Sequence, residues 1–273
     1  MTTLAVPETA SYVISLLDDG RPYGKLEGLA RKAILERHST LPAQGYTYNQ
    51  EAGQRVIDFV ENYCRHYKVE WAGKPMLLEP WQKACISESF AWYRPDGQRL
   101  VRTMWIEIAR KNGKSQLAAA LGMYLLVADG EPGAEVYSSA TKRDQARIVF
   151  EAAKAMVSQD SQLRKWCKQN RMNISVSRTR SKMEPLSAEG DTLDGLSPHA
   201  NIVDEIHAHR DRLVWDVLLT AQGSRRQPMN IVITTAGTFD PTQIGWQLHD
   251  YAVKLLDKTL EDPGWFVWIS SAD

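Results

Sequence analysis

A glycine, a lysine and a serine stand together at Gly113, Lys114 and Ser115, where two contrasting segments of the chain meet. The preceding run, residues 104–108, is apolar and partly β-branched, which predicts a short buried strand. The following run, to about residue 128, is rich in alanine and leucine at helical spacing, which predicts a helix. In such a unit, loop N–H groups can face an anion, the lysine can reach the β- and γ-phosphates and the serine can ligand Mg²⁺. The segment therefore predicts a phosphate-binding loop.

This loop departs from the usual phosphate-loop pattern at one position. The pattern G-x-x-x-x-G-K-[ST] has its first glycine five places before the second, where this chain carries Ile108. Gly-Lys-Ser alone is a common tripeptide, so the nucleotide prediction depends on the strand and the helix predicted around it.

A second chemical signal is the Asp-Glu pair at the end of the apolar run 201–205. Asp204, at the carboxyl end of a buried strand, could hold Mg²⁺ through water. Glu205 is expected to point the other way, because side chains alternate along a strand, and could polarise a water for attack on the γ-phosphate. The alternative is that the pair caps the following helix. His207 and His209 come next and are expected to be solvent-exposed loop histidines rather than metal ligands.

Another apolar run, residues 230–238, predicts a strand with hydroxyl groups at its carboxyl end. Ligands bind at that end of an open parallel sheet. Thr234 or Thr235 could therefore hydrogen-bond the γ-phosphate or the Glu205 carboxylate and report hydrolysis to the rest of the domain. Ordinary threonines at a strand end are the alternative.

Gln82 lies two residues after Pro80, which is suited to the first turn of a helix. Its amide carries both a donor and an acceptor, which match the edge of adenine. A surface glutamine on an amphipathic helix is the alternative.

Three regions are expected along the chain. Residues 1–70 have apolar residues at helical spacing and predict a helical N-terminal arm. Residues 71–240 alternate between strand and helix patterns, which predicts an α/β core with a mostly parallel sheet flanked by helices. Residues 241–273 predict an amphipathic helix and a strand-like run, interpreted as a small C-terminal lid or linker subdomain.

Composition limits the function without defining it. Lys+Arg and Asp+Glu are equal at 33 each in the 273 residues, so no global field attracts nucleic acid, and DNA contact would need a local basic patch. Residues 161–183 carry seven basic and no acidic residues, and are either a solvated hairpin edge or such a patch. The three cysteines form no CxxC pair, which suggests neither zinc nor disulfides and fits a reducing compartment. No signal peptide or apolar run of about 18 residues is present, so we expect a soluble protein and no membrane contact.

Four segments follow one another along the chain: the Pro-Trp-Gln82 segment, the loop, the Asp-Glu strand and the Thr-Thr strand. Together they resemble the ATPase half of the large terminase subunit of tailed bacteriophages, from about residue 77 to residue 273. The most specific feature is the variant loop. Terminases resemble one another in replacing the first glycine and carrying an arginine just after it, and here Ala109 and Arg110 fill that place.

The resemblance implies a P-loop NTPase of the ASCE or RecA-like class that uses ATP and Mg²⁺ and contains Walker A and Walker B motifs. It implies that Gln82 contacts adenine, and that Ser115 and Asp204 hold Mg²⁺. Glu205, Lys114 and Arg110 become catalytic, with Arg110 as a nucleotide-responsive switch. The nucleotide-binding loop comprises Ala109, Arg110, Lys111, Asn112, Gly113, Lys114 and Ser115. The coupling motif comprises Thr234, Thr235 and Ala236.

The resemblance also implies partners: double-stranded DNA, the portal protein, the small terminase subunit and further copies of this chain in a ring, expected to be a pentamer. The protein would work in the host cytoplasm and dock transiently on the procapsid. Some relatives carry a trans-acting arginine before the Asp-Glu strand, but residues 189–201 contain none, so Arg143, Arg225 and Arg226 are the candidates. The nuclease half, an RNase H-like metal domain, is not expected in this chain.

Two other functions fit some of these residues. Asp204-Glu-Ile-His207 also matches a DExH box, which predicts a helicase-like ATPase, but such helicases need a second RecA-like domain that the residues after Thr238 are too few to form. A non-hydrolysing structural or DNA-binding module would explain Ile108, but it does not explain why the lysine, the serine and both carboxylates are present.

Overall fold

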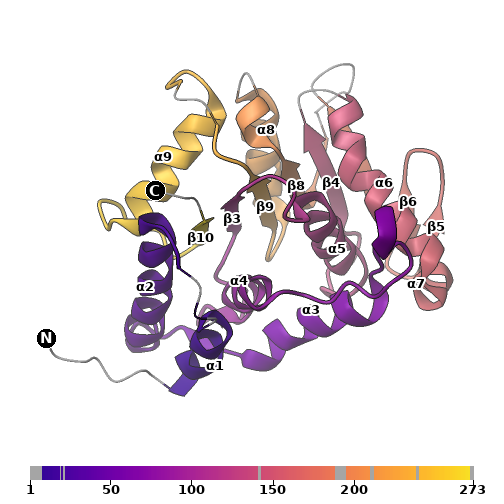
Figure 1. Cartoon of the computed structure of the whole chain (residues 1–273). Helices are drawn as coiled ribbons and strands as arrows, with labels where there is room; N and C mark the ends of the chain where they lie inside the picture. Colours follow the sequence, from indigo (N-terminus) through magenta and orange to yellow (C-terminus); the bar gives the residue numbers. More distant parts are fainter. Residues whose placement is uncertain are drawn as a thin grey trace, which may run out of the picture.

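The computed structural model describes residues 8–18, 20, 22–140, 143–187, 195–209, 212–237 and 240–270. Within these ranges one large sheet forms the centre of the molecule, with strands in the order β10-β3-β9-β8-β4-β7-β6-β5 (Figure 1). Neighbours from β10 to β7 are parallel, and β7, β6 and β5 are antiparallel. The strands are β3 (Thr103–Ile108), β4 (Glu135–Ala140), β5 (Lys168–Gln169), β6 (Ile174–Val176), β7 (Ser181–Ser187), β8 (Pro198–Asp204), β9 (Met229–Thr234) and β10 (Trp265–Ser270). The predicted mostly parallel sheet is confirmed.

Helices cover this sheet, and the helices of the N-terminal region precede its first strand in the chain. The α-helices are α1 (Glu8–Leu17), α2 (Lys25–Thr40), α3 (Gln50–Tyr63), α4 (Pro80–Phe90), α5 (Lys114–Val127), α6 (Arg143–Gln159), α7 (Ser161–Trp166), α8 (Leu213–Ala221) and α9 (Ile244–Leu256). Short 3₁₀ helices are η1 (Pro42–Gln44), η2 (Val69–Trp71), η3 (Ile206–Ala208) and η4 (Gln222–Ser224), and β1 (Thr47–Tyr48) pairs with β2 (Trp92–Tyr93). Among the described residues, no helix combines the length and apolar character needed to cross a membrane.

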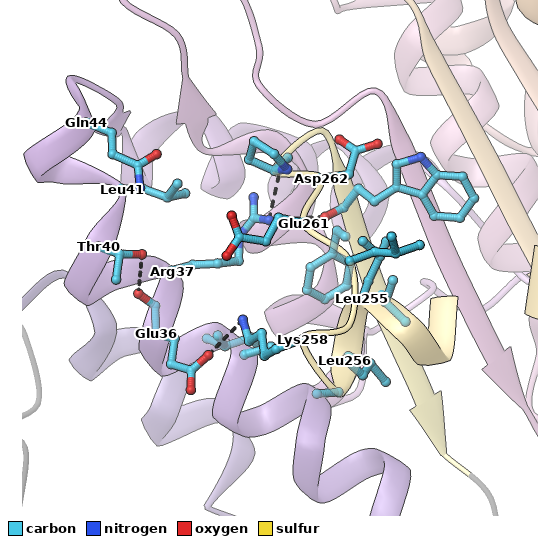
Figure 2. Close-up of a pocket in the computed structure, with 18 residues that line it drawn as sticks. Glu36, Arg37, Thr40, Leu41, Gln44, Leu255, Leu256, Lys258, Glu261 and Asp262 are labelled. Atoms are coloured by element: carbon cyan, nitrogen blue, oxygen red, sulfur yellow. Dashed lines mark hydrogen bonds and ion pairs between the residues drawn. The ribbon is translucent and has the colours of Figure 1, made fainter. Parts of the chain in front are cut away.

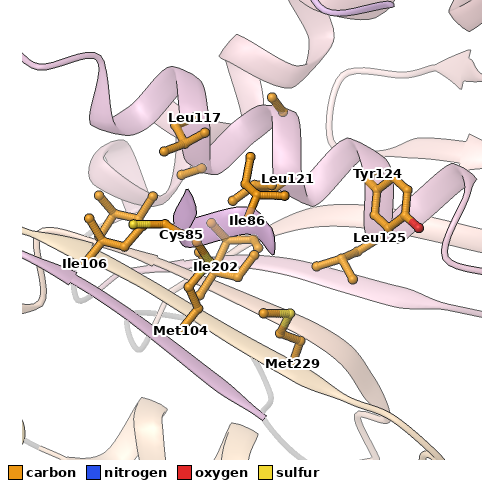
Figure 3. Close-up of a cluster of buried hydrophobic side chains, with 14 of the residues drawn as sticks. Cys85, Ile86, Met104, Ile106, Leu117, Leu121, Tyr124, Leu125, Ile202 and Met229 are labelled. Carbon is orange, nitrogen blue, oxygen red and sulfur yellow. The ribbon is translucent and has the colours of Figure 1, made fainter. Parts of the chain in front are cut away.

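The strand β3 is buried along its whole length, because helices cover both faces of the sheet. On one face, Met104 and Ile106 belong to the cluster that holds Leu117 and Leu121 of α5, with Ile86 of α4 in the same cluster (Figure 3). On the other face, the Trp105 ring stacks on Trp265, with centroids 6.4 Å apart. Burying such side chains contributes about 1.5–3 kcal/mol each, so β3 and the start of α5 are firmly placed.

The strand order brings the predicted site together. The strand β9 lies between β3, which leads into the Gly-Lys-Ser loop, and β8, which ends in Asp204. Glu107 of β3 pairs in register with Thr234 of β9, and Asp204 pairs with Ile233. Because the three strands are parallel, their carboxyl ends meet at one edge of the sheet, where ligands bind in open α/β folds.

Candidate nucleotide site

The loop after β3 is held by hydrogen bonds to the carbonyl oxygen of Ala109. Asn112 Nδ2 and Lys114 Nζ both donate to it, at 3.1 Å each. Lys111 and Gly113 both have positive φ, 69° and 70°, a conformation that suits glycine but is uncommon for lysine. Residues 109–113 are exposed, whereas Lys114, the first residue of α5, is 6% exposed. A buried ammonium and the amino end of α5 therefore lie at the base of an exposed loop, the arrangement expected of an anion site.

The carboxylate of Asp204 faces the first turn of α5. Ser115 Oγ donates a hydrogen bond to Asp204 Oδ2, while Asp204 Oδ1 is buried and has no hydrogen-bond partner among the described residues. Burial raises the pKa of Asp204, and the nearby Glu205 charge adds to this shift. No group of three or more His, Cys, Asp or Glu side chains in the described part of the chain could hold a metal ion. The Ser115–Asp204 pair nevertheless presents oxygen atoms of the kind that bind a hydrated Mg²⁺ alongside phosphate.

Glu205 reaches the same edge by a route that differs from the sequence expectation. The strand ends at Asp204, and Glu205 adopts a left-handed backbone with φ 57° and ψ 49°, so alternation along the strand does not set its direction. Its N–H donates to the carbonyl of Ile233 at 3.0 Å, which fixes this turn against β9. A non-glycine residue in this region costs about 1–3 kcal/mol, and such strain clusters at functional sites.

The Glu205 side chain faces both the phosphate loop and the threonines. Oε1 lies 3.8 Å from Lys114 Nζ, and Oε2 accepts the hydroxyl hydrogen of Thr235 at 3.1 Å. Burial alone would raise the pKa of Glu205, but the contact with His207 and the Lys114 charge lower it below its usual range. The carboxylate is therefore ionised at neutral pH, as a group that polarises a water must be.

The histidines after Glu205 are not the exposed loop residues that the sequence suggested. His209 is 4% exposed, and the His207 side chain is 23% exposed. The turn η3, which contains His207, packs against the start of α9 at Gly245, which explains why His207 is not exposed. His207 Nδ1 lies 3.1 Å from Glu205 Oε2 and 3.0 Å from Thr234 Oγ1. Sequence reasoning missed this contact, and the only signal for it was the position of His207 two residues after Glu205.

Gln82 has a structural use in addition to any contact with adenine. It is the third residue of α4 and is 7% exposed. Its Oε1 accepts the N–H of Glu79 at 2.9 Å, while the Glu79 side chain accepts the N–H of Gln82, which together form a capping box. The adenine contact stays a prediction.

Two of the three candidate trans-acting arginines lie near the amino ends of the strands, and the third lies after a carboxyl end. Arg225 donates to the carbonyl oxygens of Ser197, Pro132 and Gly133 at 2.9, 3.3 and 2.7 Å, near the amino ends of β8 and β4. Arg226 is exposed close by, before the amino end of β9. Arg143 starts α6, after the carboxyl end of β4, although its side chain lies outside the described part of the structure. Part of the segment 189–201, where the resemblance implied a trans-acting arginine, also lies outside the described residues, at 189–194.

A groove visible in Figure 2 is separate from this site. It lies between α2 and the segment from α9 to β10, and Glu36 and Lys258 form an ion pair of 2.7 Å there. None of the residues predicted to bind nucleotide lines it.

Comparison with known proteins identifies a family and two relatives. The family described as terminase large subunit, ATPase domain, matches residues 80–252. The chain is 34% identical over 216 residues to the terminase large subunit of Enterobacteria phage HK97, covering 75% of this chain and 40% of that protein. It is also 38% identical over 73 residues to protein YmfN of Escherichia coli K12, covering 24% of this chain and 16% of that protein.

The crystal structure of the HK97 bacteriophage large terminase superposes with a TM-score of 0.66 at 30% identity, covering 80% of this chain and 43% of that one. The chain thus spans about two fifths of the length of this relative. The comparisons do not favour the helicase-like alternative. The chain belongs to the family of terminase large-subunit ATPase domains and has a P-loop NTPase fold.

Proposed function

We propose that this chain hydrolyses ATP to drive double-stranded DNA into a viral procapsid, as part of a terminase large subunit. The observation that carries the proposal is the meeting of the phosphate loop, the Ser115–Asp204 pair and the Glu205–Thr235 pair at one sheet edge. The groups come together from the carboxyl ends of three neighbouring strands, β3, β8 and β9, as in nucleotide-hydrolysing α/β enzymes.

In this proposal Lys114 and the N–H groups of residues 109–113 hold the phosphates, and Gln82 contacts adenine through the part of its amide not used in the cap. Arg110 is exposed on the same loop, beside the phosphates, and serves as the switch residue. Thr234, Thr235 and Ala236 couple the state of the site to the rest of the domain.

Mg²⁺ fits the residues present, because Asp204 Oδ1 is a buried carboxylate oxygen with no hydrogen-bond partner among the residues that the structure describes. Ser115 and Asp204 would hold the ion, and when bound it would neutralise charge on the phosphates.

Glu205 acts as the general base in the hydrolytic step. Its carboxylate, held by Thr235 and lying near Lys114, accepts a hydrogen bond from the attacking water and takes up its proton as attack proceeds. Lys114 then stabilises the negative charge on the oxygens of the transferred phosphoryl group.

For the assembled motor we propose a homo-oligomeric ring, expected to be a pentamer. The ring docks on the portal protein of the procapsid in the host cytoplasm, and the small terminase subunit is a further partner. Of the three arginine candidates, Arg143 suits a trans-acting role best, because it alone lies at the carboxyl edge of the sheet. Arg225 is already engaged by three backbone carbonyls at the opposite edge.

The proposal is tested by measuring ATP hydrolysis by the chain with and without double-stranded DNA, and DNA packaging by the full-length protein. Lys114→Ala should abolish both activities, whereas Lys32→Ala, on the exposed surface of α2, should leave both unchanged. Hydrolysis that survives Lys114→Ala would contradict the site, and strand unwinding by the purified chain would favour the helicase alternative.

A further inference from the structure

We propose that His207 is a positioning residue for ATP hydrolysis, whose Nδ1–H holds the Glu205 carboxylate beside the threonines of the β9 end. This inference rests on the proposed function, because it assigns a role relative to Glu205.

The hydrogen-bond network determines which ring nitrogen carries the proton. The hydroxyl of Thr234 donates to the carbonyl of Thr235 at 3.2 Å, and the hydroxyl of Thr235 donates to Glu205 Oε2 at 3.1 Å. An ionised carboxylate oxygen can only accept, so the 3.1 Å contact between His207 Nδ1 and Glu205 Oε2 requires a hydrogen on Nδ1, and Thr234 Oγ1, 3.0 Å from the same nitrogen, then accepts as well. The network therefore assigns the hydrogen to Nδ1.

That one N–H faces two acceptors that belong to different parts of the site. Thr234 Oγ1 is 3.0 Å away in the predicted coupling motif, and Glu205 Oε2 is 3.1 Å away in the predicted catalytic pair. Thr235 Oγ1 lies 3.4 Å from the same nitrogen. Glu205 Oε2 is consequently held from two sides, by a hydroxyl of β9's end and by an imidazole of η3.

Two glycines show that the position of His207 is built into the fold. A Cβ on Gly237 would lie 2.9 Å from His207 Cβ, and a Cβ on Gly245 would lie 2.6 Å from His207 Cα. Real Cβ atoms do not approach so closely, so both contacts require glycine. The loop after β9 and the start of α9 therefore hold this histidine from two directions.

The surroundings of the imidazole indicate that it acts through Glu205. It lines a cavity of about 80 Å³ behind the site, together with Thr234, Thr235 and residues of α9. That space is too small for a nucleotide. Residues other than glycine rarely adopt the left-handed backbone conformation of Glu205. The direction of its carboxylate therefore depends on its contacts with His207 and Thr235.

The test exploits the use of Nδ1 rather than Nε2. Asparagine can place its amide N–H near the Nδ1 position, whereas glutamine extends its amide towards the Nε2 position. We expect His207→Gln and His207→Ala to lower kcat for ATP about 10- to 100-fold, as loss of a supporting hydrogen bond to a functional residue does. KM and binding of a non-hydrolysable ATP analogue should not change. His207→Asn should retain a higher kcat than His207→Gln.

Equal kcat values for His207→Gln and wild type would overturn the inference, as would a kcat for His207→Asn no higher than that for His207→Gln. A loss confined to KM or to analogue binding would do the same. Urea unfolding of each variant identifies misfolding, and the Asn–Gln comparison stands even where His207→Ala is unfolded. A wild-type chain without ATP hydrolysis would instead contradict the proposed function itself.

Discussion

The close contact between α9 and the turn after Asp204 predicts the effect of one added methyl group. A Cβ at position 245 would lie 2.6 Å from His207 Cα and 3.0 Å from the carbonyl oxygen of Ile206. Both are backbone atoms, so neither can rotate away. Ordinary contact begins at 3.4 Å, which means that α9 and η3 must separate by about 0.8 Å in Gly245→Ala, the difference between 3.4 and 2.6 Å.

Such overpacking costs about 1–3 kcal/mol. Replacing glycine by alanine in a helix returns at most about 1 kcal/mol, and less at the second residue of α9, near its end. We therefore expect Gly245→Ala to lower the free energy of unfolding by about 0.5–2 kcal/mol. The displacement also moves His207, and shifts of about 1 Å near a site can lower kcat by up to about 100-fold.

Urea unfolding midpoints and ATP turnover of Gly245→Ala measure both effects. The matched control is Gly223→Ala in η4, where a Cβ would meet no atom within 4 Å. The control should keep the wild-type midpoint and turnover. Equal midpoints for the two variants, or a more stable Gly245→Ala, would refute the close packing of α9 on η3.

Three further predictions concern other parts of the chain. Asp129→Ala should cost about 3–5 kcal/mol in urea unfolding, because it leaves the guanidinium of Arg99, which is 2% exposed, without the carboxylate it now contacts at 2.7 Å. The hydrogen bond with Glu107 raises the pKa of His249, so this contact stabilises the fold below about pH 6.5 and is lost as pH rises through the higher native value. The difference in urea midpoint between wild type and His249→Gln should therefore shrink with rising pH; a constant difference would contradict this. Gln82→Glu keeps the capping box but loses the amide donor, so the urea midpoint should hold while KM for ATP rises, and an unchanged KM would argue against the adenine contact.

Local pattern was enough to predict most elements that carry the site. The apolar run 104–108 became β3, Thr103–Ile108, and the alanine- and leucine-rich run from Lys114 became α5, Lys114–Val127. Both are short-range signals, because a strand buried on two faces and a helix buried almost all round are apolar throughout. The division of the chain at residues 70 and 240 stays a prediction.

The features that sequence reasoning missed depend on contacts between distant segments. Glu205 was expected to follow strand alternation, but its N–H bonds to Ile233 of β9 and the backbone turns left-handed. The surroundings of His207 depend on Thr234 of β9 and on Gly245 of α9, some 30 and 40 residues later in the chain. Likewise the run from Trp265 was expected to be strand-like, but its parallel pairing with β3 at the edge of the main sheet was not predicted. Pairing over such separations leaves no periodic signal in either segment.

The central claim is that Glu205 activates the water that attacks ATP held by Lys114 and Ser115. Paired measurement of ATP turnover and of ATP binding in Glu205→Gln tests it most directly, because the substitution removes the charge but keeps the shape of the side chain. Turnover should fall by at least about 100-fold, the usual contribution of a general base, while ATP binding in the presence of Mg²⁺ is retained. A Glu205→Gln protein that hydrolyses ATP at the wild-type rate would contradict the account.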